Sequence, residues 1–292
     1  MKKVIYSLYI DIPDEELDYQ KPYLWDNISK TNRTKELFKK HYHKLLEVKK
    51  QYSKNINVDF KMYENDDQYK EYHKFFKENY PEITTYNIIN FYKIHLLYEL
   101  SKKYDEILYL DFDVVPVTKE SFFDVWDLTK GICVLNNNNS VNKKNRKIHQ
   151  IKNHSVRSPT AKYFNAQAML IETDHSPVND VINTGIIGIN KEHLNQLGYF
   201  SDFKNDLKLM GDLKNNNEYD LFPKNIVDIF GYDNETLFSY KIKTNDVKVQ
   251  WLDDKWHNFY DIEYYIPKDT KLVHVINKRF DFVWRFYEKC DL

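Results

Sequence analysis

The stretch EILYLDFDVVP, residues 106–116, decides how the rest of the chain is interpreted. It opens with a short, continuous apolar run and closes with two aspartates and a proline. A run of β-branched and aromatic residues bounded by breakers of regular structure is typical of a strand buried on both faces. We therefore predict a buried strand that ends immediately before Asp111 and Asp113.

The sequence before this strand alternates between strand and helix patterns. Strands are predicted at residues 4–10 and 57–63, and helices at residues 33–52, 66–78 and 87–103. Such alternation predicts a Rossmann-like α/β fold, in which a doubly wound, mostly parallel central sheet carries helices on both faces. Ligands of these sheets bind beyond the carboxyl ends of the strands, where the aspartate pair is expected.

The second half of the chain is less regular. A helix is predicted at residues 236–242, and residues 136–158, rich in Asn, Lys and His, read as a mobile loop. The lysines of residues 33–52 are expected to form a solvated helix face. Further short strands are predicted at residues 131–135, 182–190, 247–252 and 271–276.

The composition excludes several classes of protein. The 292 residues, 42% hydrophobic and 30% charged, suit a globular chain with a sizeable core. A formal net charge of −1 provides no general attraction to nucleic acid or anionic membranes, so neither is an expected partner. Cys133 and Cys290 cannot form a disulfide framework. No apolar stretch is long enough for a signal-peptide core or a membrane span, and we expect a cytoplasmic location.

Asp111 and Asp113 are candidate metal ligands. Side chains two residues apart at a strand end point to the same side, so both carboxylates would face one cleft. Carboxylate oxygens are the ligands that Mg²⁺ and Mn²⁺ prefer, and these ions keep positions open for water or phosphate oxygens. An isolated D-x-D is also typical of a solvated turn. After a buried strand, however, two carboxylates without a counter-charge are unfavourable, which favours the metal site.

The sequence around this strand resembles the D-x-D strand of GT-A-fold glycosyltransferases, in particular glycosyltransferase family 8. The resemblance extends over most of the chain from Asn87 to Trp284, and it implies a GT-A fold and a nucleotide-sugar donor. The matching stretches are NFYKIHLLY (90–98), YDEILYLDFDVVP (104–116), INTGIIGIN (182–190), DNETLF (233–238), WLDDKWHNF (251–259) and LVHVINKRF (272–280).

The resemblance also implies roles for individual residues. It places a divalent ion, Mn²⁺ or Mg²⁺, on Asp111, Asp113 and His274. Asp111 would share the metal or bind the ribose, and Tyr9, at the end of the first predicted strand, is the candidate for the nucleobase. The remaining candidates are Lys93 for the donor, Asn183 and Gly185 for the donor sugar, Asp233 or Glu235 for its hydroxyls or the acceptor, and Lys278 for the pyrophosphate.

The chain departs from the family pattern after His274. Family members usually carry a glycine three residues after this histidine, followed soon by Lys-Pro-Trp. Here Asn277 stands in the glycine position, Lys278 and Arg279 follow at once, and Trp284 comes much later. Arg279 is therefore an alternative to Lys278 at the pyrophosphate.

Several candidates also have an ordinary structural interpretation. Lys93 on a helix is solvated by default, and acids such as Asp233 and Glu235 suit the first turn of any helix. Trp256 is more typical of a core than of an acceptor platform. Residues 163–171 (YFNAQAMLI) are a second match to the Asn-containing strand, but Gly185 favours the stretch around Asn183, because glycine allows close approach of a ligand to the backbone.

We expect one domain over residues 1–292, with a nucleotide-binding half (1–115) and a half for donor sugar and acceptor (116–292). The expected activity is metal-dependent transfer of a sugar, from UDP-sugar as the family's commonest donor, to a hydroxyl acceptor such as a glycan. The resemblance implies retention of the anomeric configuration, whereas inversion would require Asp233 or Glu235 as a general base.

Two other classes of function remain open. A haloacid-dehalogenase-type phosphatase would use Asp111 as its nucleophile. It would also need an acidic pair after a later apolar strand, whereas Gly211 and Asp212 stand in a polar stretch. A non-catalytic carbohydrate-binding module would suit the 16% aromatic content. The sequence indicates no oligomeric state.

Overall fold

The computed structural model describes residues 1–13, 30–138, 158–215, 222, 224–228, 230–260, 265–290 and 292. These residues form two compact units. Unit 1 comprises Met1–Leu128, Gly185–Asn190 and Leu252–Leu292, and unit 2 comprises Thr129–Thr184 and Lys191–Trp251. The chain thus passes from one unit to the other several times. The expectation of a single domain stays a prediction.

The main sheet of unit 1 is built around β3 (Glu106–Leu110), the strand predicted from the apolar run. Its strand order is β2 (Asp59–Tyr63), β1 (Lys3–Leu8), β3 and then the unit 1 part of β6 (Ile182–Asn190). β1 is parallel to both β2 and β3, whereas β6 is antiparallel to β3. Every residue of β3 is buried, which agrees with the continuous apolar sequence.

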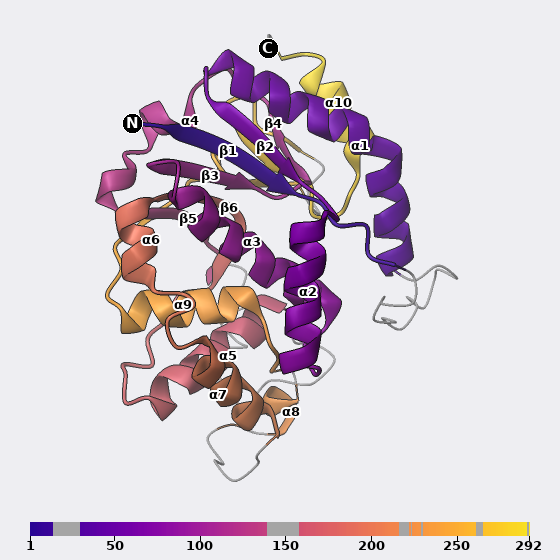
Figure 1. The fold of residues 1–292 in the computed structure, drawn as a ribbon. Coiled ribbons are helices and arrows are strands. Elements are labelled where there is room, and N and C mark those ends of the chain that lie inside the picture. Colours follow the sequence, from indigo (N-terminus) through magenta and orange to yellow (C-terminus); the bar gives the residue numbers. More distant parts are fainter. Residues whose placement is uncertain are drawn as a thin grey trace. The chain divides into compact units, whose positions relative to one another are not determined.

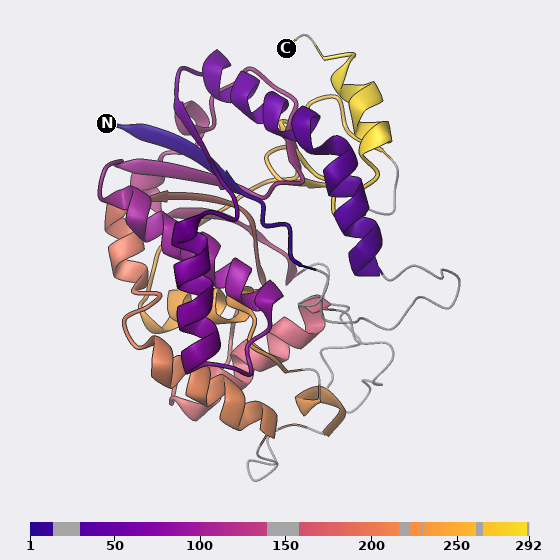
Figure 2. The same cartoon turned by 45° about the vertical axis from the view of Figure 1, so that its right-hand side comes forward.

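Helices flank this sheet, as Figures 1 and 2 show. Tyr6 of β1 donates a hydrogen bond from its hydroxyl to the Lys93 carbonyl (2.6 Å), and thereby joins the strand to α3. α2 packs on α3, whereas α1 packs along β2 and β4. The helices of unit 1 are α1 (Lys30–Asn55), α2 (Asp67–Asn79), α3 (Thr85–Ser101), α4 (Phe122–Val125) and α10 (Phe280–Tyr287).

A second, three-stranded sheet of unit 1 carries the end of the D-x-D segment. Its order is β4 (Val114–Pro116), β9 (Leu272–His274) and β8 (Asn258–Phe259). β4 and β9 are antiparallel, and Val114 is paired with His274. An apolar cluster lies among α1, β4, β9 and α10. Helix α10 lies beside α1 in Figures 1 and 2. The cluster includes Leu45, Val48, Phe112, Val115, Val273, Phe280 and Trp284.

Unit 2 combines a parallel strand pair with a helical layer. β5 (Ile132–Asn136) pairs in parallel with β7 (Val249–Trp251). Helix α5 packs against three other helices of the unit, and a buried ion pair joins Lys241 and Asp206 at 2.7 Å. The helices are α5 (Ser158–Glu172), α6 (Lys191–Leu197), α7 (Phe203–Asn215), α8 (Lys224–Val227) and α9 (Asn234–Thr244). A 3₁₀ turn at Leu128–Lys130 begins at the last residue of the first unit 1 segment.

The α/β class predicted from the sequence is confirmed. The pairings β1–β2, β1–β3 and β5–β7 are parallel, and the pairing β3–β6 is antiparallel. Helices flank these strands. Residues 163–171, considered as an alternative strand, instead belong to helix α5. Trp256 is buried, as expected for a core residue. Most of the predicted loop 136–158 lies outside the described residues. In the described part of the chain, every helix is too short or too polar to span a membrane.

One glycine of unit 2, Gly131, is expected to contribute to the stability of the fold. Gly131 has a φ of 148°, and a Cβ at this position would lie 2.7 Å from the Lys248 carbonyl oxygen. Gly131→Ala should therefore lower the free energy of unfolding by about 1–3 kcal/mol, measured by urea denaturation. Gly231→Ala is the matched control, because a Cβ there would meet nothing within 4 Å. Equal stability of the two variants would contradict this account.

Candidate metal centre

A tight turn after β3 presents the two aspartates. The Asp111 N–H donates to the Gly185 carbonyl at 2.7 Å, which fixes Asp111 on β6. The Val114 N–H donates back to the Asp111 carbonyl at 2.9 Å and closes the turn before β4 begins. Both carboxylates therefore lie just beyond the carboxyl end of a buried strand, where ligands of parallel sheets bind.

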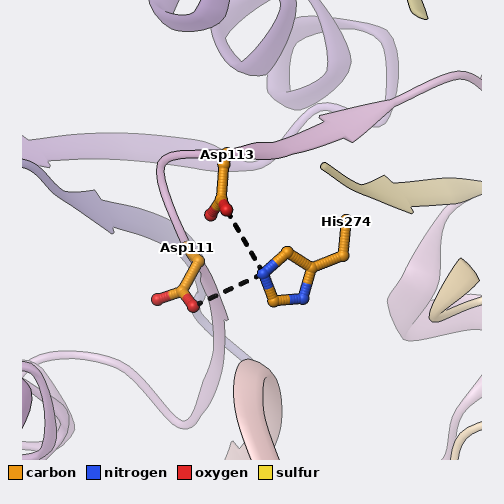
Figure 3. A group of neighbouring side chains, drawn as sticks. All are labelled: Asp111, Asp113 and His274. Atoms are coloured by element: carbon orange, nitrogen blue, oxygen red, sulfur yellow. Dashed lines mark ion pairs between the residues drawn. The ribbon is translucent and has the colours of Figure 1, made fainter. Parts of the chain in front are cut away.

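His274 is brought to this turn by the pairing of β4 with β9. The Val275 N–H donates to the Asp113 carbonyl at 3.0 Å, next to the register pair of Val114 and His274. Nε2 of His274 lies 3.4 Å from Asp113 Oδ2 and 3.8 Å from Asp111 Oδ2 (Figure 3). One potential ligand atom from each of the three side chains lies within 4.8 Å of the others. The three predicted ligands thus converge.

Two further predicted residues contact the aspartates. The Lys278 ammonium pairs with Asp113 Oδ2, and the Lys278 backbone is held in the left-handed region at φ 59°. The Lys93 ammonium is buried and lies 3.5 Å from Asp111 Oδ1, which also accepts a hydrogen bond from the Tyr109 hydroxyl at 2.5 Å. Both lysines therefore place positive charge beside the carboxylates.

Opposite charge keeps Asp113 ionised in its buried position. Burial alone would raise the pKa of Asp113, but Lys278 and His274 together lower it below its usual value. Its side chain is 7% exposed, against 27% for Asp111. Asp113 therefore stays ionised although solvent barely reaches it, and Asp111 is the more accessible carboxylate.

His257 is part of the site and was missed in the sequence. Nε2 of His257 lies 3.0 Å from Nδ1 of His274, on the side of that ring away from the carboxylates. Burial lowers the pKa of His257 well below its usual value, and neighbouring His274 lowers it further, so the ring is neutral. A signal was present in the sequence, because His257 directly follows Trp256 in the stretch 251–259 that resembles the family.

Lys49 of α1 is a second residue that the sequence did not reveal. Its ammonium is fully buried and donates to the carbonyls of Phe112 (2.8 Å) and Val114 (2.7 Å), on either side of Asp113. Burial lowers the pKa of Lys49 to about 7, opposed in part by the charges of Asp113 and Asp111. Its place four residues after Leu45, on the apolar stripe of the helix, was the available signal.

The residues at this turn fit a divalent cation. Two carboxylates and one imidazole offer oxygen and nitrogen ligands from three points within a small sphere, a donor set that suits Mn²⁺ or Mg²⁺. Asp113 and His274 are both 5% exposed, so the protein would surround much of such an ion while Asp111 leaves one side open.

Tyr9, the candidate for the nucleobase, lies in an aromatic group at the end of β1. Its ring stacks on Phe112 with the centroids 4.9 Å apart and also contacts Phe38 and Tyr42. Among the described residues its buried hydroxyl has no hydrogen-bond partner. Burial, with the charges of Asp11 and Glu64, raises the pKa of Tyr9 to about 12. The residue is thus a neutral aromatic surface next to the metal turn.

Three candidates for the donor sugar and acceptor, Asn183, Asp233 and Glu235, belong to unit 2, whereas Gly185 belongs to unit 1. Asp233 caps α9 by accepting from the N–H groups of Glu235 and Thr236, each at 3.0 Å. Glu235 accepts from the Thr184 N–H (2.8 Å) and hydroxyl (3.1 Å) and pairs with Lys162. Asn183 immediately precedes Thr184 on β6. Glu235 therefore anchors the strand that carries Asn183.

Comparison with known proteins gives similarity at the level of structure alone. No protein-family model matches the sequence, and no curated protein matches it. Similar solved structures include a glycosyltransferase involved in glycosylation of the major capsid of PBCV-1, with 15% identity, coverage of 99% of this chain and 100% of that chain, and a TM-score of 0.47.

Two further glycosyltransferases show comparable similarity. The galactosyltransferase LgtC, in complex with donor and acceptor sugar analogs, is 11% identical over 94% of this chain and 87% of its own, with a TM-score of 0.47. Mouse xyloside xylosyltransferase 1 is 15% identical over 75% and 76%, with a TM-score of 0.41. At these values the matches assign no activity to this chain and locate none of its residues.

The buried ammonium of Lys49 should make stability depend on pH. The unfolded chain keeps this proton up to the ordinary pKa of 10.5, whereas the folded protein releases it at about 7. Between these values the unfolded state binds more protons, so the free energy of unfolding should rise with pH, by at most about 1.4 kcal/mol per pH unit. Urea denaturation between about pH 7.5 and about pH 9.5 measures this slope.

Two lysine variants isolate this contribution. Lys49→Met should lose it, and the control Lys50→Met, at the adjacent exposed position, should keep it. The same slope in wild type and Lys49→Met would show that Lys49 does not titrate in this window.

Proposed function

We propose that this chain is a GT-A-fold glycosyltransferase that uses a divalent metal ion and a nucleotide-sugar donor. The observation that carries the proposal is the convergence of Asp111, Asp113 and His274 just beyond the carboxyl end of β3. This place and this donor set suit a cation that binds a diphosphate. The ordered resemblance of six sequence stretches supports the same function, and UDP-sugar is the proposed donor. The cysteine content favours a cytoplasmic location.

The residues of unit 1 can divide the work of binding the donor. In sugar transfer the departing nucleoside diphosphate gains negative charge, which a bound Mn²⁺ or Mg²⁺ stabilises as a Lewis acid. Asp113 and His274 would hold the ion, and Asp111, restrained by Lys93, would share it or bind the ribose. Lys278 already lies against Asp113 and would supply positive charge to the pyrophosphate, with Arg279 as the alternative.

The contacts within unit 2 support transfer with retention. A general base for an inverting reaction needs a carboxylate poised on the acceptor hydroxyl. Both oxygens of Glu235 are already engaged, one by Thr184 and the other by Lys162. Asp233 uses one oxygen to cap α9, and its second lies 3.5 Å from Lys162. We therefore propose that Asn183 and Gly185 bind the donor sugar while Asp233 and Glu235 orient this region or the acceptor.

The phosphatase alternative is poorly supported by the structure. Such an enzyme needs a later acidic pair after an apolar strand, but Gly211 and Asp212 lie in helix α7, and Asp212 pairs with Lys208 at 2.6 Å. A carbohydrate-binding module without catalysis has no need of converging carboxylates at a strand end. Transfer or hydrolysis of a nucleotide-sugar in the presence of Mn²⁺ would distinguish an enzyme from such a module.

Calorimetric titration of UDP and GDP, each with and without Mn²⁺, tests the proposal directly. Wild-type protein should bind one nucleotide, UDP in our proposal, and only when Mn²⁺ is present. Asp113→Asn keeps the size of the side chain but removes its charge, so metal-dependent binding should weaken more than about tenfold. Asp254→Asn, at an exposed position of unit 1, should bind like wild type. If folded wild-type protein binds neither nucleotide, the glycosyltransferase proposal fails.

The stereochemistry provides an independent prediction. If no carboxylate serves as a general base, the product should keep the anomeric configuration of the donor. NMR of the glycoside formed from a donor of known anomer, read from the coupling of its anomeric proton, decides this point. An inverted product would overturn the proposed retention and assign the base to Asp233 or Glu235.

A further inference from the structure

His257 is placed to control how His274 binds a metal ion. Its Nε2 lies 3.0 Å from His274 Nδ1, while His274 Nε2 faces the two carboxylates (Figure 3). The two nitrogens of His274 therefore have different partners, a second imidazole on one side and the candidate metal position on the other.

The chemistry of imidazole connects the two sides of this ring. A neutral histidine carries one proton, so one nitrogen donates and the other offers a lone pair. His274 can bind a metal ion through Nε2 only if its proton is on Nδ1, and a buried N–H needs an acceptor. The hydrogen bond that the structure gives to Nδ1 joins it to Nε2 of His257.

We propose that His257 is a positioning residue for the metal centre, which accepts the hydrogen bond from His274 Nδ1 and so keeps Nε2 available as a ligand. This inference rests on the metal site of the proposed function. Ligating histidines generally donate their second N–H to a carboxylate, a carbonyl or water. Here a second histidine fills that place.

The surroundings of His257 hold its ring in one place. The His257 N–H donates to the Asp253 carbonyl at 2.9 Å, and the adjacent Trp256 N–H donates to the Asp253 side chain at 3.0 Å. The next strand, β8, pairs in parallel with β9, with Phe259 opposite His274. The Phe259 ring contacts both imidazoles, at centroid distances of 4.9 Å and 5.4 Å. His257 is 1% exposed, so its acceptor is shielded from solvent. When Nε2 accepts, the proton of His257 lies on Nδ1, which has no hydrogen-bond partner among the described residues, so it is the metal ion on His274 that favours this arrangement of protons.

The alternative position of the proton shows what His257 would prevent. If the proton of His274 moves to Nε2, it faces Asp113, whose Oδ2 lies 3.4 Å from Nε2 and can accept it. A cation would then have to displace this proton before binding. Loss of the acceptor at residue 257 should therefore weaken metal binding, even in a protein that remains folded.

The affinity for Mn²⁺ alone, measured by calorimetry in the absence of nucleotide, tests the inference. His257→Leu removes the acceptor, so the affinity should fall about 10- to 100-fold, the usual effect of losing a partner of a metal ligand. In His257→Gln the amide oxygen can occupy the position of Nε2, and the affinity should stay within about threefold of wild type. Rescue by Gln separates a hydrogen-bonding role from mere packing.

A buried histidine elsewhere in unit 1 provides the matched control. His41 accepts a hydrogen bond from Trp284 Nε1 at 3.0 Å and contacts none of the three candidate ligands. His41→Leu should lower stability but leave the Mn²⁺ affinity unchanged. NMR of ¹⁵N-histidine-labelled protein saturated with Mg²⁺ provides a second measurement: in wild type, Nδ1 of His274 should be protonated and Nε2 should carry no proton.

Each outcome has a distinct meaning. Wild-type affinity in His257→Leu would overturn the inference and leave the metal centre intact, and so would a loss in His257→Gln equal to that in His257→Leu. No binding of Mn²⁺ by folded wild-type protein would overturn the metal centre and the role of His257 with it.

Discussion

The charge of Asp113 is the constraint on which the site depends. An unpaired carboxylate in so buried a position would cost several kcal/mol, so the fold has to supply compensation. Lys278 and His274 provide it directly, and each comes from a separate feature of the chain. The antiparallel pairing of β4 with β9 places His274 beside Asp113. Lys278 follows four residues later, with its own backbone in the left-handed region. The pairing within the second sheet of unit 1 thus positions groups that compensate the buried charge of Asp113.

Lys49 adds a positive charge beneath the same turn and connects it to the core. Its ammonium holds the carbonyls on both sides of Asp113, while neighbouring Leu45 and Val48 pack in the apolar cluster with Phe112. A lysine in this place fixes the backbone of the turn more firmly than an apolar side chain could, because it satisfies two carbonyls at once. The cost is a buried charge whose pKa is lowered to about 7. Lys49 thus both holds the backbone of the turn in place and lowers the stability of the folded protein through its buried charge.

The sequence predicted what depends on local pattern and missed what depends on tertiary contact. The buried strand 106–110 and the aspartates after it follow from an apolar run with a sharp end, and His274 followed from the family resemblance. Lys49 looked like one of many lysines on a solvated face, because only the packing of α1 on β4 buries it. The role of His257 depends on the pairing of β8 with β9, which no spacing reveals. The stretch 163–171 resembled the family's Asn-containing strand, yet it belongs to helix α5.

These contacts also imply that binding of a cation and folding are coupled. The residues around the proposed ion come from positions 49, 111–113, 257, 274 and 278, so the unfolded chain contains no preformed site. In the folded protein the Lys278 ammonium and His274 Nε2 both face Asp113 Oδ2, the oxygen that a cation would take. An ion at this place would compete with Lys278 for Asp113 and release the ammonium towards a diphosphate. The arrangement that keeps Asp113 buried without a metal would therefore also supply the positive charge that the proposed nucleotide-sugar donor requires.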